Sequence, residues 1–425
     1  MVRLEASPVH VRRRLTALGV LVAIAVVLTV VLTGGGHPAS RFAPAAGPSP
    51  TTRDPIAYDA ARRGAFERAA AGGVAHVLYA KSVGGVVATA RRVAAFRPLV
   101  DRAGWDPDTL EALIFLESGG RPDAQAGSDP SAAAGLTQIV AETGRDLLHM
   151  RIDLARTRTL ERAIAGGRRV AARQRELRRV DERFDPAKAI AATVRYLRFA
   201  RAKLGRDDLA VASYHMGVGN LQSVMRAYGA QGAGGTVSYA QLYFDSSPLH
   251  HAAAWNLLAS FGDDSSTYLW RIEAAKEIMR LYRTRPAELR RLAALQMRSG
   301  SSERVMHPAA SAATAGQLAR LPVARLRRDG IAVGGRIAAG GLRPRALAAL
   351  EVLGAGTQAI ARTSPLLVTG LDATGWSFDV SRVYRSGAQA LAFQFMLDRL
   401  TALGWIAWER DPTVIHVTAA AKPPV

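Results

Sequence analysis

The sequence lacks cysteine altogether among its 425 residues. This absence excludes disulfide bonds, thiolate nucleophiles and zinc sites built from thiolates. It leaves the compartment open, because a chain of this length can bury a core without covalent cross-links. The length is sufficient for two or three domains, and a hydrophobic content of 49% is typical of a globular protein.

Acidic residues are scarce relative to basic ones, with 35 Asp and Glu against 56 Lys and Arg, and the formal net charge is +21. Such an excess predicts an anionic partner, which could be nucleic acid, a membrane surface or an acidic polymer of a cell wall. Aromatic residues make up only 6% and are not interleaved on a basic face. Nucleic acid is therefore the least favoured of the three partners.

One long apolar run stands near the N-terminus, in "VHVRRRLTALGVLVAIAVVLTVVLTGGG". The uncharged stretch Leu15–Thr33 has 19 residues, within the roughly 17–25 that span a bilayer. The preceding segment 1–14 holds three consecutive arginines and should stay cytoplasmic, which places the rest of the chain outside the cell membrane as a single-pass protein. A cleaved signal peptide is the alternative, although its best cleavage site, at 43–45, lies well beyond the apolar run. An extracytoplasmic chain would meet wall polymers rather than nucleic acid.

Changes of composition divide the remainder of the chain. Stretches rich in Gly, Pro and small residues predict linkers, and an Ala-rich helical pattern fills the region between them. Near the C-terminus, strand-like runs such as "WSFDVS" and "TVIHVT" surround one helical stretch, which is typical of a small α+β module. The expected segments are a flexible linker 34–57, a helical preamble 58–95, a mainly α domain 96–290, a linker 297–317 and an α+β module 318–425.

The mainly α domain contains a strongly basic insert at 145–184 that is expected to be helical. Its arginines could contact anionic glycan or teichoic polymers of the wall. They could equally form an ordinary solvated helix face. The pattern leaves both interpretations open.

A short helix is predicted within "GWDPDTLEALIFLESGG". Asp106 is suited to accept hydrogen bonds from the first-turn amides, and Pro107 is suited to the first helical position. The pair Gly119 and Gly120 is suited to the C-terminal stop.

Glu117 is the notable residue of this helix. It shares the i, i+3, i+4, i+7 pattern of the apolar face with Leu110, Leu113 and Ile114. Burial and the C-terminal end of the helix dipole would both raise its pKa, as a general acid requires. The alternative is that Glu117 simply points to water at the helix end, and the pattern alone does not separate the two.

Four further segments form a pattern in this order: "ESGGRPDAQAGS", "AAGLTQI", "FDPAKAIAATVRYLRFARAKLGRDDLAVASYHMGVGN" and "DSSTYLWRIEAAKEIM". In order and in rough spacing they resemble motifs of the soluble-type lytic transglycosylases, whose catalytic domain has a goose-type lysozyme fold. The resemblance implies a lysozyme-like, mainly α catalytic domain. This sequence departs from the family at four positions, and Glu117 and Gln138 are a few residues further apart than in the family. The four departures are Thr137 for Met, Ala141 for Pro, His215 for Asn and Met216 for Ala.

The resemblance implies roles for individual residues. Glu117 would be the catalytic acid and base, and Ser118 would support its helix end. Gln138 would hydrogen-bond the substrate from a loop that Gly135 lets pass close to the sugar. The expected substrate-binding residues are Ser118, Ser128, Gln138 and Tyr214, with no metal and no cofactor. A half-buried core tyrosine is the alternative interpretation of Tyr214.

A hydrolytic glycosidase normally uses two carboxylates. The acids nearest to Glu117 in sequence, Asp123 and Asp129, lie in a turn-like loop and are expected to be solvated. A single acid suits a reaction without activated water. The resemblance therefore implies a lyase that cleaves peptidoglycan glycan strands between N-acetylmuramic acid and N-acetylglucosamine and leaves a 1,6-anhydro ring. The alternatives are a hydrolytic muramidase and a non-catalytic wall-binding scaffold.

The α+β module faintly resembles zinc D-Ala-D-Ala carboxypeptidases. Asp379, Glu409 and His416 match the family's acid and metal-ligand positions, but Asp372 stands where the first histidine is expected. A catalytic zinc site usually needs three protein ligands. The module is therefore expected to be non-catalytic, either binding stem peptide or supporting the lyase.

Overall fold

The computed structural model divides into two compact units. Of the described residues, 89–199 form the first unit, and 58–88 together with 200–421 form the second. The expected segments 1–14, 15–33 and 34–57 lie outside the described part of the chain. Within that part, no helix is both long enough and apolar enough to cross a membrane. The structure describes residues 58, 60–167, 169–230, 237–246, 250–261, 264–296, 301–307, 318–335, 337–362 and 365–421.

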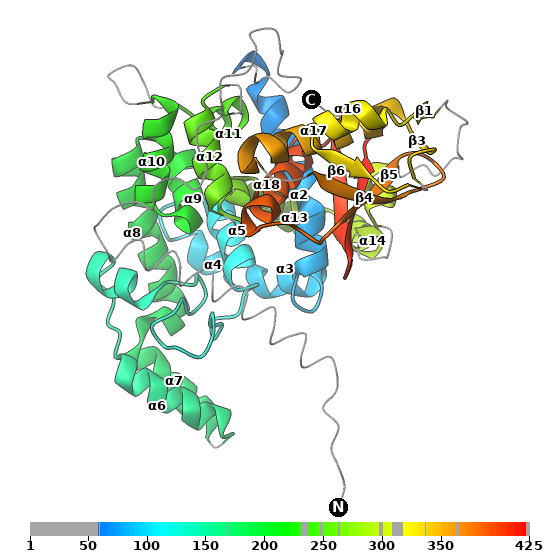
Figure 1. The fold of residues 1–425 in the computed structure, drawn as a ribbon. Helices are drawn as coiled ribbons and strands as arrows, with labels where there is room; N and C mark the ends of the chain where they lie inside the picture. The colour runs from blue at the N-terminus through cyan, green and yellow to red at the C-terminus, as the bar shows by residue number, and fades with distance from the viewer. Residues whose placement is uncertain are drawn as a thin grey trace, which may run out of the picture. The chain divides into compact units, whose positions relative to one another are not determined.

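The first unit is helical, as expected for this part of the chain (Figure 1). Two of its helices, α3 and α8, continue across the division into the second unit. Its elements are α3 (Val86–Ala94), α4 (Arg97–Val100), α5 (Pro107–Glu117), the π-helix η2 (Thr143–Leu147), α6 (Leu154–Ala165), α7 (Val170–Val180), the 3-10 helix η3 (Glu182–Phe184) and α8 (Pro186–Leu204).

Helix α5 begins and ends where the sequence predicts. The Asp106 carboxylate accepts from the main-chain N–H of Thr109 at 3.1 Å and so caps the first turn. At the other end, Gly119 and Gly120 have φ of 60° and 75°, values that a residue without a Cβ adopts at no steric cost. The C-terminal stop therefore falls directly after Glu117.

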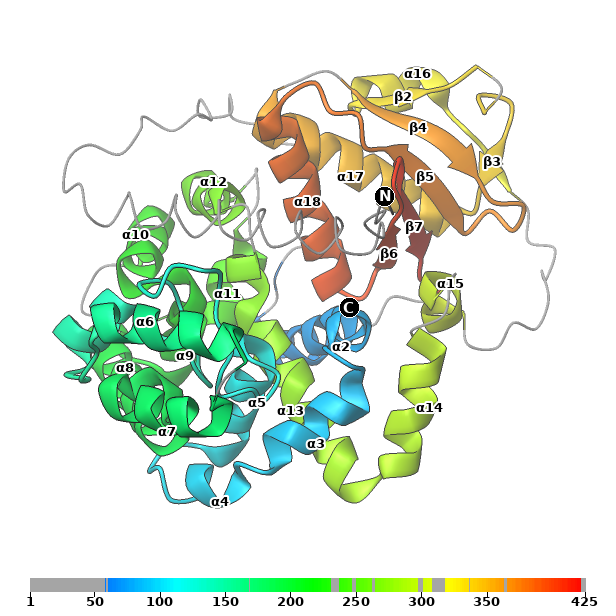
Figure 2. The ribbon, with the colours of Figure 1, turned by 90° about the horizontal axis from the view of Figure 1, so that it is seen from below.

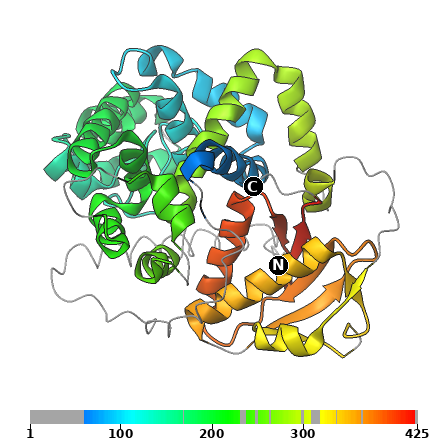
Figure 3. The ribbon, with the colours of Figure 1, turned by 90° about the horizontal axis from the view of Figure 1, so that it is seen from above.

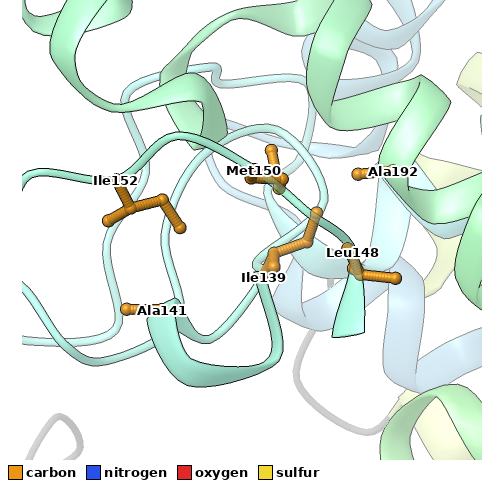
Figure 4. Packing of buried hydrophobic residues seen from close by; sticks show 6 residues of the cluster. All are labelled: Ile139, Ala141, Leu148, Met150, Ile152 and Ala192. Carbon is orange, nitrogen blue, oxygen red and sulfur yellow. The ribbon is translucent and has the colours of Figure 1, made fainter. Parts of the chain in front are cut away.

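A small apolar cluster supports the loop that follows α5. Figure 4 shows its side chains converging from this loop and from α8. Because these residues are almost entirely withdrawn from water, they fix the loop's course by burial rather than by regular secondary structure. The cluster consists of Ile139, Ala141, Leu148, Met150, Ile152 and Ala192.

The basic insert 145–184 forms the helix pair α6 and α7, which pack against each other (Figure 2). Its polar surface is mostly exposed, but Leu160, Leu177 and Phe184 are buried together with Ala134. The insert is thus anchored by an apolar contact to the loop that contains Gln138. Its helical character is confirmed.

The second unit combines helices with two sheets (Figures 1 and 3). Its helices are η1 (Ala60–Arg62), α2 (Arg63–Lys81), α9 (Asp207–Met216), α10 (Val218–Tyr228), α11 (Tyr239–Asp245), α12 (Ala252–Ser260), η4 (Asp264–Thr267), α13 (Tyr268–Thr284), α14 (Pro286–Gln296), α15 (Ser301–Met306), α16 (Val323–Arg328), α17 (Pro344–Ala361) and α18 (Gly387–Ala402). Its strands are β1 (Ala319–Arg320), β2 (Ile331–Val333), β3 (Gly341–Leu342), β4 (Leu366–Leu371), β5 (Ser377–Ser381), β6 (Ile406–Arg410) and β7 (Val414–Ala419).

The larger sheet has the strand order β2-β4-β5-β7-β6. Strand β2 runs parallel to β4, and all other neighbours are antiparallel. Helices α17 and α18 pack against each other and contact this sheet (Figure 2). The expected α+β character of 318–425 is therefore present. Helix α15 lies inside the stretch 297–317, which the sequence analysis expects to be only a linker.

The preamble helix α2 packs against α13 and α18. Its backbone comes so close to α18 that one contact position requires a glycine. A Cβ added to Gly73 would lie 1.6 Å from the carbonyl oxygen of Thr401 in α18. Also from α18, buried Arg399 donates to the carbonyl oxygens of Tyr243 and Phe244 in α11, at 2.7 and 2.9 Å. The units therefore differ from the expected domain boundaries, because helices from three distant stretches share one core.

Candidate functional site

Glu117 is the last residue of α5 and is half-buried. The three apolar residues that share its face, Leu110, Leu113 and Ile114, are each at most 2% exposed. The apolar face is therefore confirmed, while Glu117 itself stands at its edge, where the core ends.

The turn after Glu117 is held by hydrogen bonds on both sides. The Ser118 hydroxyl donates to the carbonyl oxygen of Ile114 at 3.3 Å and accepts from the N–H of Arg121 at 3.2 Å. Arg92 of α3 donates from Nε to the carbonyl oxygen of Gly119 at 2.9 Å. Ser118 is buried and bonds the backbone on both sides of this turn. Its expected contact with substrate stays a prediction.

Gln138 lies in a tight turn of the following loop. Ala134 and Ile139 close this turn with two main-chain hydrogen bonds of 3.1 Å, and Gln138 itself has a left-handed φ of 52°. Its side-chain Nε2 donates to the carbonyl oxygens of Gly135 at 2.9 Å and of Ala124 at 3.1 Å. These bonds fix the amide plane, so the Oε1 atom presents an acceptor in a defined direction.

The structure explains the glycine at position 135 differently from the expected close approach to a sugar. Its φ is 82°, and a Cβ there would lie 1.8 Å from the main-chain carbonyl oxygen of Arg183. The close approach that requires a glycine is thus to the end of the basic insert. This contact accounts for the glycine without a contact to a sugar.

Replacing Gly135 with alanine is expected to destabilise the protein by about 3 kcal/mol or more, because the new methyl group must displace a backbone segment and adopt a strained φ. Thermal or denaturant unfolding would measure the loss. Gly167→Ala is a matched control, since Gly167 has a similar φ of 75° but nothing within 4 Å of the place that a Cβ would occupy. Equal losses in the two variants would show that backbone strain, and not the contact with Arg183, is decisive.

Arg183 is completely buried and binds the Gln138 loop from inside. Its guanidinium forms a two-pronged pair with equally buried Asp181, with Nε–Oδ1 at 3.0 Å and Nη2–Oδ2 at 2.7 Å. Its remaining N–H groups donate to the carbonyl oxygens of Pro130 at 2.7 Å, Ala132 at 2.8 Å and Ile139 at 3.4 Å. The sequence analysis treats the arginines of the insert as surface charges, and for Arg183 this is wrong. The only sequence signal is the Asp-x-Arg-Phe pattern at the insert's end.

The extra residues between Glu117 and Gln138 form a loop that two main-chain hydrogen bonds close at its base. The N–H of Ala126 donates to the carbonyl oxygen of Ala133 at 2.9 Å, and that of Gly135 to the carbonyl oxygen of Ala124 at 2.8 Å. Ser128 lies exposed within this loop. Its expected substrate contact gains no support from this position and stays a prediction.

The two acids of this loop behave as solvated turn residues. Asp123 and Asp129 are both exposed. The Ser131 main-chain N–H donates to Asp129 at 3.0 Å and its hydroxyl at 2.7 Å, and these bonds lower the pKa of Asp129. A carboxylate stabilised in its charged form is unsuited to donate a proton, so Asp129 is a poor candidate to replace Glu117 as the acid.

One acid of α5 is missed by the sequence analysis. Glu111 is completely buried and pairs with Arg97, whose Nη1 lies 2.9 Å from its Oε2. The same guanidinium bonds Asp108 at 2.7 Å, and these partners raise the pKa of Arg97. Glu111 thus links α5 to Arg97 at the start of α4.

Tyr214 belongs to the second unit, whereas the other expected site residues belong to the first. It is half-buried near the end of α9, which Gly217 terminates with a φ of 87°. Its neighbour His215, a departure from the family pattern, bonds Ser265 Oγ at 2.9 Å and stacks on Tyr268 at 5.2 Å. His215 therefore connects α9 to the start of α13, which accounts for a histidine at this position.

The α+β module brings its three expected residues together. Asp379 on β5, His416 on β7 and Glu409 on β6 are cross-strand neighbours. Asp372 instead accepts from the N–H of Ser377 at 2.7 Å, within the turn between β4 and β5.

His416 is held between two carboxylates. Its Nδ1 lies 2.7 Å from Asp379, and its Nε2 bonds Glu303 of α15, a residue that the sequence analysis misses. The hydrogen bond with Glu303 raises the pKa of His416 to about 9, and the same bond lowers the pKa of Glu303 to about 2. The cluster forms an internal ion pair that links α15 to the sheet.

This ion pair predicts a window of pH in which the cluster stabilises the fold. The raised pKa of His416 contributes stability below about pH 6.5 that is lost as pH rises through about 9. The lowered pKa of Glu303 contributes above about pH 4.5 and is lost as pH falls towards 2. The difference in melting temperature between the wild type and His416→Gln should be largest between about pH 4.5 and 6.5 and should shrink as pH rises through about 9. A difference in melting temperature that does not change with pH would contradict this role of the ion pair. So would the same pH dependence in the surface variant His149→Gln.

Comparison with protein families gives one match. Residues 96–234 match the family described as the transglycosylase SLT domain. Members of this family are lytic transglycosylases that act on peptidoglycan, and the chain is accordingly an enzyme of this class. The match covers the segment from the start of α4 to beyond α10, including Glu117, Gln138 and Tyr214. No curated protein and no solved structure matches the chain.

Proposed function

We propose that the chain is a membrane-anchored lytic transglycosylase that cleaves between N-acetylmuramic acid and N-acetylglucosamine without water, with Glu117 as its single acid and base. The observation that carries the proposal is the position of Glu117 inside the matched SLT segment, at the edge of an apolar helix face. Neighbouring Asp123 and Asp129 are exposed, which favours a mechanism that needs no second carboxylate.

In the proposed first step, the Glu117 carboxyl group transfers its proton to the glycosidic oxygen. The bond from this oxygen to C1 of the muramoyl residue breaks, and N-acetylglucosamine leaves with a new hydroxyl group. The positive charge at C1 is stabilised by the substrate's own acetamido group. General acid catalysis of this kind contributes about 10²–10⁴-fold.

In the second step, the Glu117 carboxylate accepts the proton of the muramoyl C6 hydroxyl. The C6 oxygen then bonds to C1 and closes the 1,6-anhydro ring. Glu117 returns to its protonated state, so that acid and base are the same group and no water is consumed.

Gln138 and Tyr214 would orient the sugar in this proposal. The Gln138 amide donates through Nε2 to its own loop, which leaves Oε1 to accept from an acetamido N–H of the substrate. Tyr214 would direct its hydroxyl to the reacting sugar, as the motif resemblance implies. Anionic wall polymers are a further proposed partner, because the arginines on α6 and α7 are mostly exposed.

Mass spectrometry of purified peptidoglycan digested with the full chain tests the reaction. The expected products end in 1,6-anhydromuramoyl groups and are lighter by one water than hydrolysis products. Reducing ends alone would identify a muramidase instead, and the absence of any product would favour a wall-binding scaffold. The proposed anchor is tested separately, by membrane fractionation of the wild type and of a variant with charged residues placed within 15–33.

A further inference from the structure

The junction between α11 and α12 gathers three side chains that can ligate a metal ion. Asp245 ends α11, and His250 and His251 directly precede α12. One ligand atom from each lies within 4.8 Å of the other two. We propose that Asp245, His250 and His251 form a binding site for a divalent transition-metal ion of the zinc type.

The distances suit a shared ion. His250 Nδ1 hydrogen-bonds Asp245 Oδ1 at 3.0 Å and the Asp245 carbonyl oxygen at 3.2 Å, and His251 Nε2 lies 3.7 Å from Asp245 Oδ2. The distance from His251 is too long for a hydrogen bond. Two ligand atoms that each lie about 2.0–2.2 Å from one tetrahedral zinc ion are roughly 3–4 Å apart. The carboxylate and the two rings are thus spaced as ligands of one ion would be.

The surroundings orient these ligands. The ring of His251 hydrogen-bonds the main chain of Tyr228 and stacks on the Tyr228 ring with centroids 3.8 Å apart. The Tyr228 hydroxyl donates to Asp245 Oδ2 at 2.5 Å, and Gln241 donates to that hydroxyl at 3.2 Å. Imidazole and carboxylate ligands in metal sites are typically oriented by such outer hydrogen bonds.

His251 directly precedes α12 and has a left-handed φ of 52°. The helix that carries Asp245 is itself fixed, because buried Arg399 donates to the carbonyl oxygens of Tyr243 and Phe244.

The donor set selects the class of metal. Two imidazoles and one carboxylate suit zinc and its transition-metal neighbours, whereas calcium and magnesium prefer oxygen ligands. Three protein ligands leave one tetrahedral position for water. A bound ion would join the end of α11 to the start of α12 and so stabilise this part of the second unit.

Calorimetric titration of the untagged, metal-free full chain with zinc alone tests the site. The wild type should bind one zinc ion per chain. His250→Ala and Asp245→Asn should abolish this binding or weaken it by more than about 100-fold. Tyr228→Phe keeps the ring that stacks on His251 but removes the outer hydrogen bond, and should weaken binding by about 10–100-fold. His149→Ala, a surface histidine outside the cluster, should bind zinc as the wild type does.

Circular dichroism of each variant would check that the fold is kept. Cobalt substitution should give the visible bands of tetrahedral Co²⁺ in the wild type and in His149→Ala, but not in His250→Ala or Asp245→Asn. The absence of saturable zinc binding in the wild type would overturn the proposal. Unchanged affinity in a folded His250→Ala or Asp245→Asn variant would do the same, because zinc would then bind elsewhere.

Discussion

Replacing Glu117 with glutamine should lower the rate of peptidoglycan cleavage by about 10²–10⁴-fold or more. The amide keeps the size and polarity of the side chain but can neither donate the acidic proton nor accept the one from C6. Both proposed steps therefore fail together. The release of 1,6-anhydromuramoyl fragments from purified peptidoglycan measures the effect.

Two controls make this result specific. The melting temperature of Glu117→Gln should match that of the wild type, since Glu117 lies at the edge of the apolar face and not within it. Asp123→Asn removes an exposed carboxylate from the next loop and should leave activity unchanged. If Glu117→Gln retained activity while Asp123→Asn lost it, the assignment of the acid would be wrong.

Replacing Arg183 with methionine should destabilise the protein by about 3–5 kcal/mol, because it leaves the Asp181 carboxylate buried without its partner. The carbonyl oxygens of Pro130 and Ala132 lose their donors in the same variant. The free energy of unfolding, measured in denaturant, gives the size of the loss. Since these carbonyls precede the Gln138 turn in the same loop, substrate affinity should fall as well.

A double variant separates two causes of this loss of stability, the unpaired buried charge and the lost bonds to the carbonyl oxygens. Arg183→Met combined with Asp181→Leu removes both buried charges and should be less destabilised than Arg183→Met alone. Arg179→Met, on the exposed surface of the same insert, should change stability by less than about 0.5 kcal/mol. A double variant as unstable as the single one would assign the whole loss to the carbonyl contacts.

The sequence predicts those parts of the site that depend on local rules. Helix α5 follows its cap, its apolar spacing and its glycine stop, and these determinants all lie within one short stretch. The strands of the α+β module follow from alternating apolar residues in the same way. In both cases neighbours in sequence suffice to decide the structure.

The parts that escape prediction depend on contacts between distant residues. Arg183 is one arginine among many in a basic insert, and only the folded chain brings Asp181 and three loop carbonyls around it. Glu303 lies in an expected linker, yet it bonds a histidine 113 positions later in the chain. Gly135 stands out in the sequence, but its steric reason lies in a segment that the sequence does not mark as a neighbour.

The close packing of α2 against α18 imposes an order on synthesis. Helix α2 arises near the start of the chain, but the backbone that it touches at Thr401 emerges only near the end. The carbonyl oxygens near the end of helix α11 likewise gain their hydrogen bonds only after Arg399 has been synthesised. The contacts of α2 and α11 with α18 are therefore complete only once α18 has been synthesised.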